Sequence, residues 1–261
     1  MLLVSGCMSP GIHVDRLARA GLLQREIVTG APFRHVTYRP QTPRPGAELH
    51  VYIEGDGKPY LTPYMVAPDP TSNLALALEL MLQDPAPTLF LGRPCYLGLA
   101  RDPQCSPPYW TFKRFSIEVV QSLVTVLQLE LERLGPRRLT LIGHSGGAAL
   151  ALLIADRVSA VERVVTVAGN MDIADWARLH QYAPLSGSVD PMTSGRHRSD
   201  LVLLHLAGSS DHNVPSNLVQ AAAAKIGGRV VIVPHFDHEC CWVRIWPDLL
   251  RQNFDPTAAI D

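Results

Sequence analysis

The stretch Leu139-Thr140-Leu141-Ile142-Gly143-His144-Ser145-Gly146-Gly147 decides the fold of this chain. Residues 139–142 are typical of a buried strand, and the apolar run that follows at 148–154 is typical of a buried helix. A glycine stands two positions before and two positions after Ser145, where a larger side chain would collide within a tight strand-to-helix turn. The pattern therefore predicts a strained turn that holds the Ser145 hydroxyl clear of the sheet.

The same alternation of apolar strands and helices continues on both sides of this stretch. Strands that are apolar throughout need cover on both faces, which predicts an α/β fold with a mostly parallel, doubly wound sheet. Functional residues of such a sheet lie at the carboxyl ends of its strands. We expect strands at 33–38, 49–53, 88–91, 139–142, 164–167, 201–206 and 230–233, and helices at 75–82, 115–134, 146–157, 216–226 and 240–250.

The composition excludes several classes of protein. Of the 261 residues, 47% are hydrophobic and 18% are charged, which is too apolar for an intrinsically disordered chain. The formal net charge of -1 gives no field that would gather nucleic acid, so we expect no nucleic-acid partner. The sequence has no uninterrupted apolar run of about 18 residues, so we also expect no membrane-spanning helix.

A serine nucleophile needs a base, and the base needs a carboxylate to orient it. Asp211 lies just past the end of the strand at 201–206, and His238 lies in the loop after the strand at 230–233, so both are expected at the same edge of the sheet as Ser145. His238 is preferred as the base because a loop of a few residues is needed to swing the ring back over the serine. The alternatives are His235 and His212 for the base, Asp172 and Asp175 for the acid, and a salt-bridge role for Asp237.

A second glycine-rich turn, Glu54-Gly55-Asp56-Gly57, follows the strand at 49–53. We expect the oxyanion to be bound by the backbone N–H of Gly146, at a helix start, and by the N–H of Asp56 or Gly57. The Glu54 and Asp56 carboxylates are expected to point away and to brace the loop through Lys58 or an arginine such as Arg93. The alternative is a Gly-Asp-Gly turn without chemistry.

With the serine turn, Asp211 and His238 in place, the sequence resembles the α/β-hydrolase superfamily over residues ~30–250. The superfamily's loop for the oxyanion usually begins His-Gly, whereas Glu54-Gly55 stands here. The resemblance implies a small cap inserted at 171–200 and a substrate pocket beside it. The expected pocket residues are His144 next to the nucleophile, Met171 and Trp176 from the cap, and Tyr109 and Trp110 as the opposite wall.

Three further segments, at 52–57, 93–95 and 237–242, are similar to small bacterial exported hydrolases that are often lipoproteins. The N-terminal residues Val4-Ser5-Gly6-Cys7 likewise resemble a bacterial lipobox, which implies lipidation and membrane attachment through Cys7. The protein would then belong to the bacterial cell envelope and face the periplasm, with residues 1–30 as a tether and 31–261 as the domain. A chance match would leave it cytoplasmic.

Four other cysteines remain. Cys95 and Cys105 lie in a loop rich in proline and glycine, and we expect a disulfide between them. The neighbouring Cys240 and Cys241 form either a strained bond or two free thiols, and the sequence leaves this open.

These features predict a serine hydrolase that cleaves carboxylic esters through an acyl-enzyme on Ser145, with a small acyl compound as its partner. The same residues would also serve an amidase or a thioesterase. The alternative from another class is a non-catalytic binding or scaffold lipoprotein on a hydrolase fold. No metal or organic cofactor is implied, because His235 and His238 are three residues apart without further ligands at matching spacing.

Overall fold

A computed structural model describes residues 11–44, 46–194 and 198–255, and these residues contain an eight-stranded sheet. The strand order is β1-β2-β6-β3-β7-β8-β9-β10. The six strands β6, β3, β7, β8, β9 and β10 run parallel to one another. β2 is antiparallel to both of its neighbours, β1 and β6. The sheet strands are β1 (Leu23–Thr29), β2 (Arg34–Pro40), β3 (Glu48–Ile53), β6 (Thr88–Leu91), β7 (Arg138–His144), β8 (Val161–Val167), β9 (Val202–Gly208) and β10 (Arg229–Val233). A separate hairpin consists of β4 (Tyr60–Thr62) and β5 (Met65–Val66).

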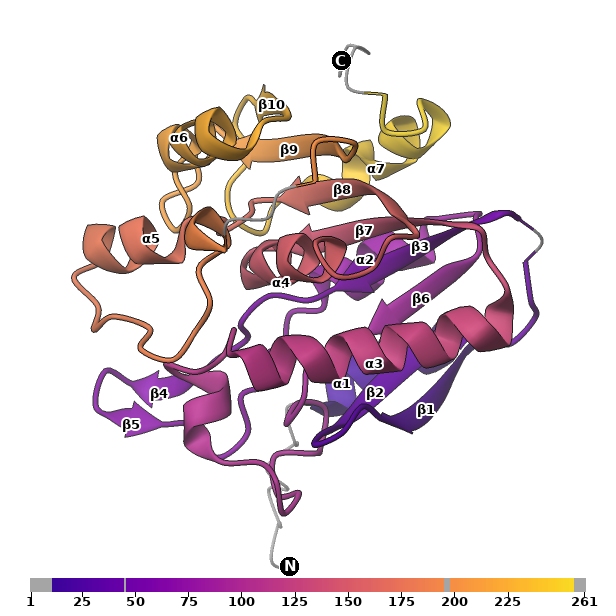
Figure 1. The fold of residues 1–261 in the computed structure, drawn as a ribbon, viewed down its shortest axis with the longest axis horizontal. Coiled ribbons are helices and arrows are strands. Elements are labelled where there is room, and N and C mark those ends of the chain that lie inside the picture. Colours follow the sequence, from indigo (N-terminus) through magenta and orange to yellow (C-terminus); the bar gives the residue numbers. More distant parts are fainter. Residues whose placement is uncertain (1–10, 45, 195–197, 256–261) are drawn as a thin grey trace, which may run out of the picture.

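Helices cover both faces of the sheet, which confirms the predicted doubly wound fold (Figure 1). α3 and α4 pack together on one face, and α2 and α7 pack together on the other. All ten residues of α4 are buried, because it packs on β7 and β8 near the centre of the sheet and is flanked by α3 and η2. The helices are α1 (Gly11–Ala20), α2 (Leu76–Leu82), α3 (Ile117–Leu134), α4 (Gly146–Ala155), α5 (Ile173–Leu179), α6 (Ser216–Ile226) and α7 (Trp242–Arg251), with 3-10 turns η1 (Pro107–Trp110) and η2 (Pro191–Thr193).

The long helix α3 shows how local chemistry sets the element boundaries. Ser116 caps its N-terminus by accepting a hydrogen bond from the Val119 N–H. Gly135 ends it in the left-handed conformation, with φ 64°, which glycine adopts without a steric penalty. The expected helix at 115–134 is therefore confirmed to within two residues.

The fold begins earlier than the sequence predicts. Residues 11–29, expected within a tether, form α1 and β1. Val14 and Ala18 of α1 are buried, and β1 pairs along its whole length with β2. β1 lies at the edge of the sheet with most of its side chains at least partly exposed, which gives its sequence too few apolar residues to predict a strand. The lipobox-like residues 4–7 lie outside the described residues.

None of the helices in the described ranges is long and apolar enough to cross a membrane.

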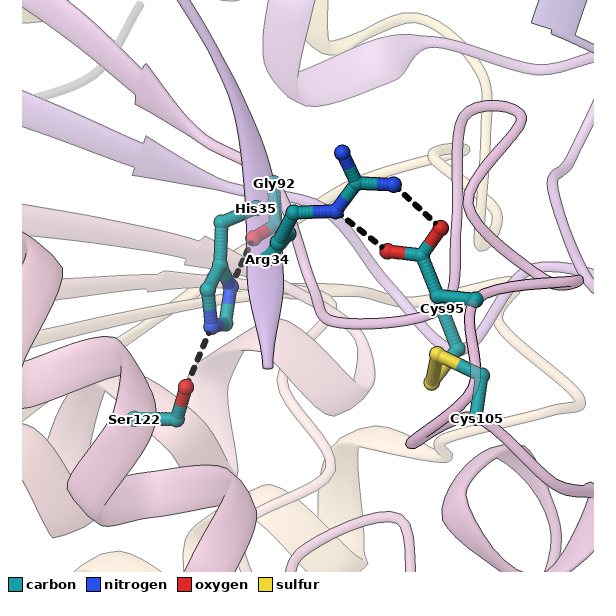
Figure 2. Close-up of a disulfide and its surroundings, with 7 residues drawn as sticks. Arg34, His35, Gly92, Cys95, Cys105 and Ser122 are labelled. Carbon is teal, nitrogen blue, oxygen red and sulfur yellow. Dashed lines mark hydrogen bonds and ion pairs between the residues drawn. A yellow bond between two sulfur atoms is a disulfide. The ribbon is translucent and has the colours of Figure 1, made fainter. Parts of the chain in front are cut away.

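The predicted disulfide between Cys95 and Cys105 is confirmed, with an S–S distance of 2.09 Å and a Cα–Cα distance of 5.5 Å (Figure 2). It closes the loop after β6, and Asp102 within that loop accepts a hydrogen bond of 2.8 Å from Arg34 Nε of β2. Cys240 and Cys241 also form a disulfide with each other, which answers the question that the sequence left open. The loops after β6 and after β10 are thus both cross-linked.

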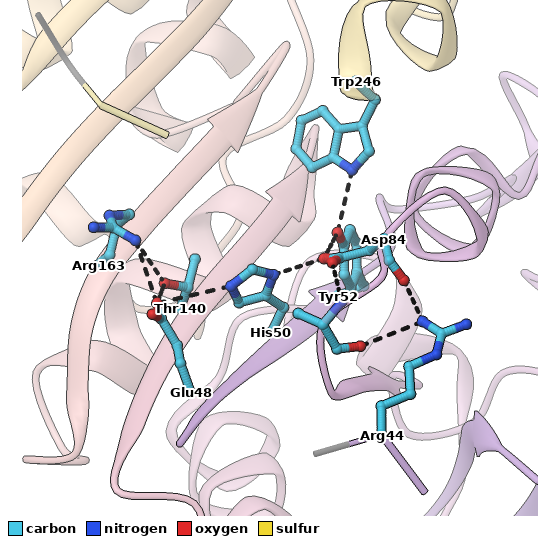
Figure 3. A network of polar contacts seen from close by, with 9 residues as sticks. Arg44, Glu48, His50, Tyr52, Asp84, Thr140, Arg163 and Trp246 are labelled. Atoms are coloured by element: carbon cyan, nitrogen blue, oxygen red, sulfur yellow. Dashed lines mark hydrogen bonds and ion pairs between the residues drawn. The ribbon is translucent and has the colours of Figure 1, made fainter. Parts of the chain in front are cut away.

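A buried polar network lies around the first half of β3, away from the carboxyl ends of the strands (Figure 3). His50 Nδ1 lies 2.6 Å from Asp84 Oδ2, and its Nε2 lies 3.7 Å from Glu48 Oε1. The Tyr52 hydroxyl donates to the same Asp84 oxygen, and the indole of Trp246 donates to Tyr52. Because carboxylates face both ring nitrogens, His50 is stabilised as an imidazolium.

Buried histidines make the stability of this fold depend on pH in both directions. Burial lowers the pKa of His35 and of His205 to about 4. The unfolded chain binds these protons below about pH 6.5, so both stabilising contributions are complete above that pH and are lost as the pH falls toward 4. Burial would also lower the pKa of His50, but Asp84 and Glu48 raise it to about 9. That contribution is complete below about pH 6.5 and is lost as the pH rises through 9.

We therefore expect the free energy of unfolding, measured by urea titration, to fall on both sides of about pH 6.5. Each histidine contributes a slope of about 1.4 kcal/mol per pH unit within its window. His35→Gln should remove one histidine's contribution from the acid slope. His50→Gln should reduce the alkaline slope and leave the part that comes from His144, whose pKa is also raised, whereas His13→Gln, at an exposed position, should change neither slope. An acid slope that is equal in wild type and His35→Gln would contradict the assignment.

Candidate active site

Ser145 occupies the tight turn between β7 and α4, with φ 51° and ψ -123°. This conformation is strained for a residue with a side chain, and the surrounding structure holds it in place. A Cβ atom on Gly143 would lie 2.4 Å from the carbonyl oxygen of Gly147, and a Cβ on Gly147 would lie 2.3 Å from that of Ile53. The predicted collision within the turn is confirmed for Gly143, whereas at Gly147 the lack of room comes from the backbone at the end of β3.

Ser145, His238 and Asp211 form one line of hydrogen bonds. His238 Nε2 lies 2.9 Å from Ser145 Oγ, and His238 Nδ1 lies 2.9 Å from Asp211 Oδ2. The other Asp211 oxygen accepts hydrogen bonds of 2.8 Å from the N–H groups of Asn213 and Val214, which fixes the carboxylate. The three side chains come from the ends of β7, β9 and β10, where parallel strands bring their carboxyl ends together.

The alternative bases and acids are placed elsewhere. His235 and His212 are exposed, and the ring that contacts Ser145 is that of His238. Asp172 caps α5 and lies 2.7 Å from Lys225 Nζ, and Asp175 pairs with Arg178 in that same helix. The exposed Asp237 accepts the N–H groups of residues 239 and 240, so it shapes the loop that carries His238.

The loop after β3 lies directly against the serine turn. A Cβ atom on Gly55 would lie 3.0 Å from Ser145 Cβ, and one on Gly146 would lie 2.0 Å from Asp56 Oδ1. Gly57 has φ 64° and follows Asp56 on the outer side of the loop. The structure thus places Gly146 and Asp56 beside the nucleophile, where the sequence predicts an oxyanion site, and Gly57 lines the same cavity as Ser145.

The Asp56 carboxylate is held between two arginines. Arg93 Nη1 donates to Asp56 Oδ1 at 2.6 Å, and Arg114 Nη1 donates to Asp56 Oδ2 at 2.7 Å. Burial alone would raise the pKa of Asp56, but Arg114 and Arg93 hold it below its ordinary value. The expectation that an arginine such as Arg93 braces this loop is confirmed, and Arg114, 58 residues away, was not predicted.

Glu54 braces the loop in a different way from the one predicted. Its Oε1 lies 3.0 Å from His144 Nδ1, and its Oε2 accepts the N–H of Ala77 at the start of α2. His144 Nε2 in turn lies 3.1 Å from the carbonyl oxygen of His238. Two signals in the sequence indicated the contact between Glu54 and His144. Glu54 stands where the superfamily usually has a histidine, and His144 directly precedes the nucleophile.

Ser145 and His238 open into a cavity of about 960 Å³. Its walls come from the loop after β3, the β4–β5 hairpin, the segment before α3 and the residues after α5. The apolar part of the lining consists of Pro59, Tyr60, Leu61, Pro63, Leu74, Phe112, Trp176, Tyr182, Ala183, Pro184 and Leu185.

The predicted pocket is correct in part. His144 and Trp176 line the cavity, as expected. Tyr109 and Trp110 do not: the Tyr109 ring packs on Phe33, and the buried indole of Trp110 donates to a backbone carbonyl. The turn η1 directs both rings into the protein, so the following residues Phe112 and Arg114 form this wall. Met171 is also absent from the lining because it is buried at the start of the inserted segment, beside Thr166.

Within the described ranges, no three histidine, cysteine or acidic side chains lie together as metal ligands would.

No family profile and no curated protein matches the sequence, but solved structures match the fold. An α/β serine hydrolase homologue from Coxiella burnetii is 14% identical with a TM-score of 0.58, over 89% of this chain and 97% of that chain. Est1E from Butyrivibrio proteoclasticus is 12% identical with a TM-score of 0.58, over 88% and 97%. TT1662 from Thermus thermophilus is 20% identical with a TM-score of 0.56, over 91% and 99%. The chain has the α/β-hydrolase fold, as the sequence predicts.

Proposed function

We propose that this protein is a serine hydrolase that cleaves carboxylic esters. The observation that carries the proposal is the unbroken line from Asp211 through His238 to Ser145, with 2.9 Å at each step. An isolated serine hydroxyl is a poor nucleophile, and this arrangement supplies the base and the oriented carboxylate that it needs.

The chemistry follows from the placement of these groups. Ser145 Oγ attacks the acyl carbon while its proton passes to His238 Nε2, and Asp211 stabilises the imidazolium that forms. The oxyanion binds the N–H of Gly146, at the positive end of α4, and the N–H of Asp56. The carbon–oxygen bond to the alcohol breaks as His238 returns the proton to it, which leaves the acyl group on Ser145. A water molecule then releases the acid by the same steps.

The cavity supports a substrate with an apolar part. Tyr60 and Leu61 of the hairpin face the same space as Phe112 and Tyr182, and all four are at least 40% exposed, so they are available to an apolar group. Amides are the second candidate substrate class, because an acylaminoacyl peptidase from Pyrococcus horikoshii is among the structures of similar fold.

A serine-directed fluorophosphonate tests the proposal without knowledge of the substrate. We expect the wild-type protein to be labelled and Ser145→Ala to remain unlabelled, because the probe reacts only with an activated serine. Ser209→Ala is the control: this serine is exposed near the same edge of the sheet, and its loss should leave labelling intact.

Folded wild-type protein that takes up no label would favour the scaffold alternative. Labelled protein can then be tested with an ester, a thioester and an amide of one acyl group. Faster turnover of the amide than of the ester would replace the esterase proposal by an amidase.

A further inference from the structure

We propose that His144 acts as an imidazolium that positions the catalytic base, and that loss of its proton inactivates the enzyme at alkaline pH. The proposal rests on the proposed function, since it concerns the geometry of His238. His144 is a positioning residue: its contacts are to Glu54 and to the backbone of His238.

The atoms around the ring determine its protonation. His144 Nδ1 lies 3.0 Å from a Glu54 carboxylate oxygen, and His144 Nε2 lies 3.1 Å from the carbonyl oxygen of His238. Both partners are acceptors, and a neutral imidazole carries only one N–H. Both hydrogen bonds therefore form together only when the ring carries two protons and a positive charge.

Glu54 is fixed so that it can hold this charge. Its Oε1 accepts the N–H of Gly55, and its Oε2 accepts the N–H of Ala77 at the start of α2. The side chain of His144 is only 9% exposed, so water competes little for its hydrogen bonds. The pair adds no net charge beside the nucleophile, because the carboxylate balances the imidazolium.

The charged groups around His144 favour the same state. Burial alone would lower the pKa of His144, but Glu54, the His238 carbonyl and Asp211 raise it above its ordinary value. The His144 and His238 ring centroids are 5.2 Å apart, and burial together with the Glu54 carboxylate raises the pKa of Glu79 in α2. The remaining charged side chains of the cavity are Asp56, Lys58, Arg114 and Glu239.

The effect on catalysis comes through the backbone. The His238 carbonyl belongs to the residue whose ring removes the serine proton. The hydrogen bond from His144 therefore restrains the backbone of the catalytic base. A neutral His144 that kept its bond to Glu54 would turn a lone pair toward this carbonyl oxygen, and the two would repel. A displacement of about 1 Å at a reacting group costs on the order of 100-fold in rate.

The rate of fluorophosphonate labelling, measured from pH 5.5 to pH 10, tests the proposal. We expect the wild-type rate to fall at a pH above 6.5, as His144 loses its proton. His144→Gln should label about 10- to 100-fold more slowly near neutral pH and should show no alkaline fall, because its amide does not titrate. Glu54→Gln should move the fall to lower pH. His235→Asn, which removes an exposed ring from the His238 loop, should keep the wild-type profile.

Histidine ¹⁵N NMR of the full chain provides a second measurement that needs no variant activity. The His144 ring should carry protons on both nitrogens at neutral pH and lose one of them at the pH where labelling slows. A labelling rate that stays level while this ring loses its proton, or a ring with a single proton at neutral pH, would overturn the inference and leave the proposed function intact. Wild-type protein that is never labelled would instead remove the proposed function.

Discussion

Asp211→Asn should lower the turnover of the proposed substrates by about 10⁴-fold, although it replaces a single oxygen by nitrogen. One oxygen of Asp211 accepts the N–H groups of Asn213 and Val214, so an asparagine must turn its own oxygen toward them. Its NH₂ group then faces His238 Nδ1, which has to become an acceptor. The proton moves to Nε2, which faces Ser145 Oγ at 2.9 Å, and the ring can no longer accept the serine proton.

Steady-state kinetics with an activated ester measure this effect, and Asp237→Asn is its matched control. Asp237 is one residue from His238, and its loss changes the net charge equally, but its carboxylate binds only the N–H groups of its own loop. We expect its turnover to remain within about 10-fold of wild type. Equal losses in the two variants would show that the charge, and not the imidazole tautomer, determines the rate.

The sequence predicted the catalytic line because parallel strands place their carboxyl ends together. Once the strands at 201–206 and 230–233 were located, the loops that follow them were expected at the same edge of the sheet as Ser145, and the need for a loop of a few residues favoured His238 over His235. The strands themselves were predictable where both faces are buried, as in β6, whose predicted bounds Thr88–Leu91 are confirmed. The local sequence pattern was sufficient for such strands because burial on both faces favours apolar residues along the whole strand.

Features that depend on distant pairs were not predictable. Arg114 reaches Asp56 from 58 residues away, and His144 reaches Glu54 from 90 residues away, so no short pattern records either contact. Side-chain direction caused the error at Tyr109 and Trp110, because an irregular turn has no periodicity that separates inner from outer residues. The edge strand β1 was missed for the related reason that its exposed side chains hide the alternation.

Asp56→Ala should lower both the stability of the fold and the turnover of the enzyme. Removal of this carboxylate leaves Arg93 and Arg114 close together without their shared partner, and their side chains are 2% and 7% exposed. Loss of one partner from a buried ion pair costs about 3–5 kcal/mol in the free energy of unfolding. Urea unfolding measures this change. Asp102→Ala is its control, since Asp102 pairs with Arg34, which is 48% exposed, and a surface pair contributes only about 0–1 kcal/mol.

The effect on turnover has a separate cause, which a double variant can isolate. The Asp56 carboxylate packs against Gly146, so it also sets the distance between the two backbone N–H groups that we propose bind the oxyanion. Loss of one such donor costs about 10²–10³-fold in kcat. Asp56→Ala combined with Arg114→Met removes one unpaired charge and should recover part of the stability, while kcat stays low because the loop remains unbraced. If kcat recovered together with stability, the Asp56 carboxylate would serve only to neutralise the arginines, and the loop would hold its backbone N–H groups in place without it.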